Sequence, residues 1–105
     1  MNSERAARVA VIGGGMMGAG VAQVFAAAGH PVALHDLYPE ALERAPRAIR
    51  SNLSFLAEHG LFPADAVATA VGRVRTTSDL ADAADGAEFV VECVFEDLGL
   101  KHGVF

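Results

Sequence analysis

Residues 8–36 read RVAVIGGGMMGAGVAQVFAAAGHPVALHD and have the layout of a strand, a helix and a second strand. The run from Val9 to Ile12 is apolar and largely β-branched, as expected of a central parallel strand that is covered on both faces. A helix is predicted from Met17 onward, and it should end at Gly29, a residue suited to a left-handed cap. Pro31 cannot continue a helix, so the rest of the stretch is predicted to form the second strand.

The predicted helix carries one apolar stripe that should lie on the sheet. Its members recur at i, i+3, i+4 and i+7 and are Val21, Val24, Phe25 and Ala28. The N-terminus of this helix points at the glycine-rich loop. That end presents free N–H groups and a partial positive charge, so it is a ready site for phosphate oxygens.

Three glycines in the loop, Gly13, Gly15 and Gly18, fall at the spacing G-x-G-x-x-G. In this motif the first glycine permits a tight turn, the second lets a pyrophosphate approach the backbone, and the third packs helix against strand. Asp36 ends the second strand, 18 residues past Gly18, where the motif places an acid that accepts hydrogen bonds from ribose hydroxyls. The combination predicts a dinucleotide site. The alternative is a glycine-rich turn in an unrelated α/β domain.

Length and composition restrict the possible functions further. The chain has 105 residues, a formal charge of −5 and a single cysteine, Cys93. The length allows one domain, and the acidic balance argues against a DNA or RNA partner. One cysteine allows neither an intrachain disulfide nor a zinc site of several thiolates, which fits a reducing, cytoplasmic location. No apolar run reaches the length that a membrane span needs.

The rest of the chain alternates helices and strands. Residues 39–59 are predicted to be helical, with a kink or break near Ala45 because Pro46 removes a backbone hydrogen bond. The apolar face of this helix comprises Leu42, Ile49, Leu53 and Leu56. Further predicted elements are a short helix from Pro63 to about Val71, a strand at 73–76, a helix capped by Ser78 or Asp79, and a strand at 88–94. The alternation predicts an α/β fold, the N-terminal portion of a Rossmann-type doubly wound parallel sheet.

The segment after the last predicted strand could reach a ligand. Glu96 and Lys101 lie just beyond the carboxyl end of that strand, where open α/β sheets bind ligands. From spacing alone, however, a helix-start acid and a solvated lysine are favoured. The four histidines, His30, His35, His59 and His102, have no evident catalytic partner and are interpreted as structural or solvated. Cys93 is interpreted as a small buried hydrophobe.

Two blocks of the sequence resemble one family: VAVIGGGMMGAGVAQVFAAAGHPVALHD and ADGAEFVVECVFEDLGLKHGVF. They resemble the NAD-binding domain of the L-3-hydroxyacyl-CoA dehydrogenases, a family that includes lambda-crystallin-type L-gulonate dehydrogenases. The pattern E-x-V-x-E-D-L-x-x-K, from Glu92 to Lys101, is the more particular of the shared features. The resemblance implies that Glu96 and Lys101 contact NAD and that Asp36 binds the adenosine ribose. The full set of implied cofactor residues is Gly13, Gly15, Met16, Met17, Gly18, Asp36, Glu96 and Lys101.

The chain also departs from this family. Asn52 and His59 stand where acyl-CoA-specific members carry a serine and a lysine that reach the CoA. The stretch ECVFEDLGLK, residues 92–101, is closer to the lambda-crystallin type, whose substrate is a sugar acid. Family members continue beyond this length through strands that carry a catalytic histidine, its glutamate partner and an asparagine, and then through a helical domain. We therefore expect residues 1–105 to be an incomplete NAD-binding domain with no catalytic residue and no metal ligand of its own.

The leading hypothesis is the NAD-binding portion of an oxidoreductase that moves a hydride between a 3-hydroxy group and NAD. The alternatives are a fragment of an L-gulonate 3-dehydrogenase-like enzyme and a free-standing NAD-binding module. NAD is preferred to NADP because Asp36 would repel a 2′-phosphate and neither Leu37 nor Tyr38 could receive one. We expect no turnover by this chain alone. We also expect a homo-oligomer, because Val90, Val94 and Leu98 should leave apolar surface uncovered.

Overall fold

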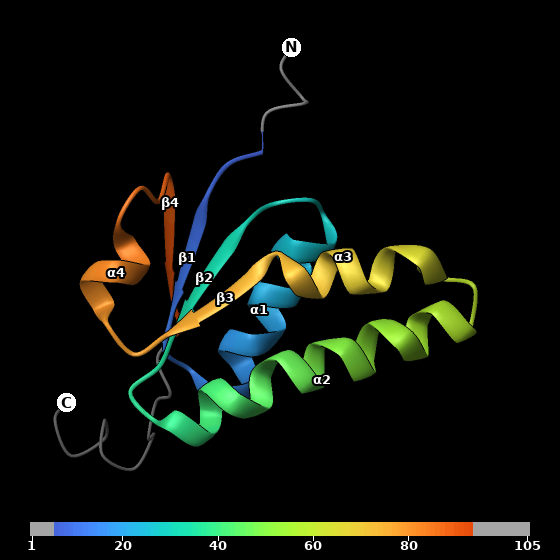
Figure 1. Ribbon diagram of the computed structural model, residues 1–105, viewed down its shortest axis with the longest axis horizontal. Coiled ribbons are helices and arrows are strands. Elements are labelled where there is room, and N and C mark those ends of the chain that lie inside the picture. Colours follow the sequence, from blue (N-terminus) through green and yellow to red (C-terminus); the bar gives the residue numbers. More distant parts are fainter. Residues whose placement is uncertain (1–5, 94–105) are drawn as a thin grey trace, which may run out of the picture.

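The computed structural model describes residues 6–93, which form a four-stranded parallel sheet with helices on both faces. The strand order is β3-β2-β1-β4, so the predicted Rossmann-type fold is confirmed. The elements are β1 (Val9–Ile12), α1 (Gly15–Ala27), β2 (Val32–His35), α2 (Pro39–Glu58), the 3-10 helix η1 (Ala64–Ala66), α3 (Val67–Gly72), β3 (Val74–Thr77), α4 (Leu80–Ala84) and β4 (Phe89–Glu92). Figure 1 shows α1, α2 and α3 on one side of the sheet and α4 on the other.

The register brings the ends of all four strands to one edge of the sheet. Ile12, the last residue of β1, lies opposite His35 of β2 and Glu92 of β4. His35 in turn lies opposite Thr77, the last residue of β3. The order reverses between β1 and β4, and ligands of open α/β sheets bind at such a switch point, outside the carboxyl ends of the strands.

The core lies between the sheet and the layer of α1, α2 and α3. Val11, Ile49 and Leu53 are the largest fully buried side chains among the described residues. The predicted apolar face of α2 is confirmed, because Ile49 and Leu53 are buried and Leu56 packs against them.

The predicted apolar stripe of α1 is partly wrong. Val24 is 65% exposed and Ala28 is exposed, while Val21 and Phe25 only pack against the edge of the core. The buried residues of this helix are Gly18, Ala19, Ala22 and Ala26. The helix is apolar on nearly every side, so the large residues do not single out one face. The closeness of helix and sheet selects the smallest residues instead.

Of the kink or break predicted near Ala45, the break does not occur, because α2 continues through Pro46 as one helix (Figure 1). Ala45 is buried, as are Ile49 and Leu53 further along the same face. Packing of this face offsets the hydrogen bond that proline removes, since most helical stability in proteins comes from tertiary contacts.

The second half of the chain follows the prediction with small shifts. The third strand begins one residue later than predicted, at Val74. Asp79 caps α4, and its side chain accepts a hydrogen bond of 3.2 Å from the Asp82 N–H. Val90 of the edge strand β4 is exposed, as predicted; Val94 and Leu98 lie outside the described residues. Within residues 6–93, none of the helices has the length and apolar character that crossing a membrane requires.

Replacing Leu53 by Ala should lower the free energy of unfolding by about 2 to 5 kcal/mol, because a buried side chain leaves a cavity. The control Leu61→Ala removes the same atoms from a side chain that is 71% exposed, and should cost less than about 0.5 kcal/mol. Urea denaturation measures both. Similar losses would contradict the packing of α2. If Leu53→Ala does not fold, Ile49→Val should still show a loss of about 0.5 to 1.5 kcal/mol.

Candidate functional site

The turn from β1 into α1 runs through three consecutive glycines with left-handed backbone, the last of which is the first residue of α1. Their φ angles are 73° at Gly13, 85° at Gly14 and 53° at Gly15. Side chains rarely adopt this conformation, so the loop can turn this tightly only with glycine. The helix α1 begins at Gly15, and Gly14 at its N-cap offers no side chain to bond the first turn. The positive end of α1 therefore faces the carboxyl edge of the sheet.

Two of the glycines allow backbone segments to pack against each other. A Cβ on Gly18 would overlap the carbonyl oxygen of Gly13, so the predicted role of Gly18 in packing helix against strand is confirmed. A Cβ on Gly14 would overlap the Cys93 side chain and lie 2.6 Å from the Cys93 carbonyl oxygen. Sequence reasoning missed Gly14. The signal was a glycine at the position between Gly13 and Gly15, where the G-x-G-x-x-G spacing does not require one.

Asp36 ties the end of β2 to the glycine loop. It is 7% exposed, and its Oδ2 accepts a hydrogen bond of 3.2 Å from the Gly15 N–H. Its Oδ1 accepts one of 3.0 Å from the Tyr38 N–H. The loop is also bonded to β2 through the backbone, because the Gly13 N–H donates to the His35 carbonyl oxygen at 2.7 Å. The predicted acid and the predicted loop thus lie within hydrogen-bond distance of each other.

Two clefts flank Asp36 and share Gly14, Asp36 and Tyr38 as walls. The first, which we call the helix cleft, has a volume of about 810 Å³. Its other lining residues are Gly15, Met16, Met17, Glu40, Ala41 and Arg44. The second, the strand cleft, has a volume of about 300 Å³. Its other lining residues are Ile12, Gly13, His35, Leu37, Glu92 and Cys93.

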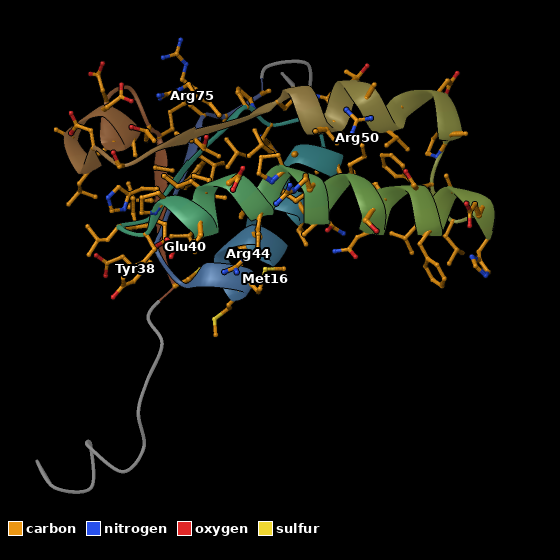
Figure 2. All side chains as sticks on the ribbon, turned by 60° about the horizontal axis from the view of Figure 1, so that its bottom comes forward. Met16, Tyr38, Glu40, Arg44, Arg50 and Arg75 are labelled. Atoms are coloured by element: carbon orange, nitrogen blue, oxygen red, sulfur yellow. The ribbon has the colours of Figure 1, made fainter. Side chains whose placement is uncertain are left out.

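The helix cleft brings together residues from α1, α2 and the segment between β2 and α2. Figure 2 shows Met16, Tyr38, Glu40 and Arg44 gathered at the same end of the molecule. Met16 and Met17 are both more than half exposed, and the Met17 N–H donates to the Gly14 carbonyl oxygen at 2.9 Å. Sequence reasoning missed Arg44, a cation on the rim of the cleft. The signal was its position two turns into the helix that follows Asp36.

The strand cleft lies over the ends of β1, β2 and β4 and contains the one cysteine. Burial raises the pKa of the Cys93 thiol, so this group stays protonated near neutral pH and is a poor nucleophile. Its side chain packs on Gly14, which confirms the interpretation of Cys93 as a buried hydrophobe. The same cleft contains His35, which is buried.

Other residues singled out from the sequence have structural partners or lie outside the described range. His30 Nδ1 lies 3.2 Å from the Ala7 carbonyl oxygen, and His59 Nδ1 lies 2.8 Å from that of Phe55. Asn52 donates a hydrogen bond of 3.0 Å to Gln23. The predicted NAD contacts Glu96 and Lys101, and also His102, lie outside residues 6–93. Within that range no three His, Cys, Asp or Glu residues form a group that could hold a metal ion.

A third cavity, of about 420 Å³, lies at the opposite end of the strands and is lined by three arginines. Two of them have partners: Arg73 donates to the Ala26 carbonyl oxygen at 2.8 Å, and Arg75 pairs with Asp82 at 2.7 Å. The hydrogen bond from Arg75 lowers the pKa of the Asp82 carboxyl group. This cavity is separated from the glycine loop by the length of the sheet, so it is no part of the site around Asp36.

Comparison with known proteins adds independent findings. The family model described as 3-hydroxyacyl-CoA dehydrogenase, NAD binding domain, matches residues 8–105. The chain is 42% identical over 95 residues to a probable 3-hydroxybutyryl-CoA dehydrogenase of Deinococcus radiodurans, covering 90% of this chain and 34% of that protein. The chain thus spans about a third of the length of this relative. Other relatives are described as mitochondrial and peroxisomal proteins, so the cytoplasmic location stays a prediction.

Solved structures give the same result for the fold. The crystal structure of 3-hydroxybutyryl-CoA dehydrogenase from Escherichia coli matches with a TM-score of 0.78 and 37% identity, covering 96% of this chain and 21% of that one. The (S)-3-hydroxybutyryl-CoA dehydrogenase of Ralstonia eutropha matches with a TM-score of 0.78 and 25% identity, covering 95% of this chain and 35% of that one.

A pair of glycine variants on α1 tests the close approach of helix and loop. Gly18→Ala should lower the free energy of unfolding by about 1 to 3 kcal/mol, because the new methyl group overlaps Gly13. Gly20→Ala meets nothing within 4 Å, and should raise stability by about 0.5 to 1 kcal/mol because alanine favours the helix. Thermal unfolding of both variants measures the difference, and a stabilising Gly18→Ala would contradict this packing.

Proposed function

Because this chain belongs to the 3-hydroxyacyl-CoA dehydrogenase family as its NAD-binding domain, we propose that it holds the cofactor of an oxidoreductase. The reaction is hydride transfer between a 3-hydroxy group and NAD. One observation carries the proposal: the Asp36 carboxylate stands beside the glycine loop at the start of α1, with an open cleft on each side. The acid and the helix N-terminus are what the ribose and the pyrophosphate of a dinucleotide require.

The residues around Asp36 fit this cofactor. A Cβ on Gly15 would meet no protein atom within 4 Å, so this side of the loop is free for the pyrophosphate. Gly13 and Gly18 shape the loop, while Met16 and Met17 provide backbone at the start of α1. We assign the pyrophosphate to the helix cleft at this point. The assignment of Glu96 and Lys101 to NAD rests on the family resemblance.

Asp36 can bind the ribose and keep its present bonds. Each carboxylate oxygen has two lone pairs, and each now accepts one backbone N–H, from Gly15 or from Tyr38. The remaining lone pairs can accept the two ribose hydroxyls. The existing bonds hold the carboxylate in place beforehand, which lowers the entropy lost when the cofactor binds.

The substrate of the whole protein is a further proposal. NAD, when bound, accepts or donates the hydride, and this chain's part is to position it. We propose an acyl-CoA thioester, supported by relatives described as 3-hydroxybutyryl-CoA and 3-hydroxyadipyl-CoA dehydrogenases. Asn52 and His59, at the positions of the family's CoA contacts, keep an L-gulonate-like substrate as the alternative. A free-standing NAD-binding module is the other alternative.

We also propose that the chain associates through the β4 side of the sheet. β4 is an edge strand of the sheet of residues 6–93, and Phe89 and Val90 on it are both more than half exposed. An unpaired strand edge with apolar side chains favours docking of a further strand or a second copy. Separately, we propose a cytoplasmic location for the chain, as its single cysteine suggests.

Replacing Asp36 by Ala should weaken NADH binding roughly ten- to a hundredfold, because charge-assisted hydrogen bonds worth about 1.5 to 3 kcal/mol are lost. Glu40→Ala is the matched control, since it removes the same charge from the same cleft and should bind NADH nearly as the parent does. Calorimetry measures both affinities. An equal loss in both variants would mean that overall charge matters and not the ribose contact. Tighter binding of NADPH than of NADH by the parent would refute the preference for NAD.

Gly15→Ala should weaken NADH binding by at least about tenfold, or 1.4 kcal/mol, because its methyl group enters the helix cleft. Any side chain strains the loop at a φ of 53°; alanine does so less than a branched residue such as valine, so it is the milder test. Gly20→Ala, on the exposed side of α1, should bind NADH as the parent does. Fluorescence titration with NADH measures the affinities, and circular dichroism checks that each variant is folded. Normal binding by Gly15→Ala would show that the loop is only a turn and does not bind the pyrophosphate.

A further inference from the structure

His35 is the one polar side chain whose burial the fold of residues 6–93 does not explain. It is 5% exposed, and its Nδ1 is the only buried side-chain nitrogen or oxygen in that part of the chain without a hydrogen-bond partner. Buried polar atoms are nearly always paired, because an unpaired one destabilises the native state. The ring therefore sits at a position where an apolar side chain would pack at no such cost.

Nearby groups do not satisfy this nitrogen. The carboxylate of the adjacent Asp36 bonds the N–H groups of Gly15 and Tyr38 instead. By contrast, the ring nitrogen Nδ1 of His30 lies within hydrogen-bond distance of a backbone carbonyl oxygen. His35 thus differs from this histidine in having no internal partner.

The position of His35 relates this nitrogen to a ligand site. Leu34 lies on the α1 face of the sheet, 3.6 Å from where a Cβ of Gly18 would be. Successive residues of a strand point to opposite faces, so His35 points away from α1. There it lines the strand cleft together with Ile12 and Glu92, its neighbours in register on β1 and β4. The side chain that carries the buried, unpaired nitrogen thus lines an open cleft.

The proposed function determines which part of the cofactor this cleft receives. The pyrophosphate is assigned to the start of α1 and the ribose to Asp36, and the strand cleft continues from Asp36 away from α1. The base attached to that ribose therefore enters the strand cleft. Ile12, Leu37 and Cys93 provide apolar walls for the ring faces, while His35 and Glu92 provide polar groups for the ring edge.

We propose that His35 recognises the adenine base of the cofactor, its Nδ1 accepting a hydrogen bond from the exocyclic amino group. A neutral imidazole with its proton on Nε2 offers Nδ1 as an acceptor. The Glu92 carboxylate across Ile12 is a second acceptor. Two acceptors select a base that carries an amino group over one that carries a carbonyl oxygen there. This inference rests on the proposed function and adds specificity for the base.

The test compares NADH with reduced nicotinamide hypoxanthine dinucleotide, in which a carbonyl oxygen replaces the adenine amino group. The parent chain should bind NADH about five- to tenfold more tightly than this analogue, the worth of one hydrogen bond. His35→Leu should bind NADH about five- to tenfold more weakly than the parent and should prefer NADH to the analogue less than the parent does, since only the Glu92 acceptor remains. If this variant keeps the affinity or the preference of the parent, the proposal is overturned.

The stability of the ligand-free variant provides a second readout. His35→Leu should unfold at the same temperature as the parent or a higher one, because an unpaired buried nitrogen is removed. A lower unfolding temperature, or failure to fold, would show that the ring serves packing and would overturn the proposal. The control His30→Leu should lower the unfolding temperature and leave both affinities unchanged, since its ring lies outside both clefts and has a carbonyl partner.

Failure of the inference can be distinguished from failure of the proposed function. If the parent does not bind NADH at all, the proposed function fails. If the parent binds NADH, Asp36→Ala loses that binding and His35→Leu binds as the parent does, only the role of His35 is refuted.

Discussion

The close approach of α1 to the end of β1 is the constraint on which the site depends. Gly18 allows it, because any side chain there would overlap the Gly13 carbonyl oxygen. This approach explains why α1 buries glycine and alanine and leaves Val24 exposed. The preceding loop has left-handed backbone at Gly13, Gly14 and Gly15, and the positive end of α1 lies at the edge of the sheet.

Asp36 connects that geometry to ligand binding. Its carboxylate bonds the loop through Gly15 and the following segment through Tyr38, so two parts of the chain hold it in place. It lies between two clefts of different character, one beside the helix start and one over the strand ends. A charged group this well buried is stable because both oxygens are bonded. The same bonds orient it for an incoming polyol such as a ribose.

Much of the fold could be predicted, because hydrophobic runs and glycines act locally. The strands at 9–12 and 32–35, the Asp79 cap and the end of α1 near Gly29 follow from neighbouring residues alone. The stripe of α1 could not be predicted, since its composition is apolar on most sides and only the distance to the sheet selects the buried face. The continuity of α2 through Pro46 likewise depends on contacts that a local propensity does not contain.

Local pattern was sufficient for the position of the glycine loop, the acid after the second strand and the order of strands and helices. These features depend on residues close together in the chain and on periodicities of helix and strand. Tertiary structure alone decided that Gly14 must accommodate Cys93, that Arg44 reaches the cleft of Asp36, and that His35 is buried without a partner in a cleft that Glu92 also lines. These relations join residues that are distant in sequence, and they exist only once the strands have paired and the helix has packed on them.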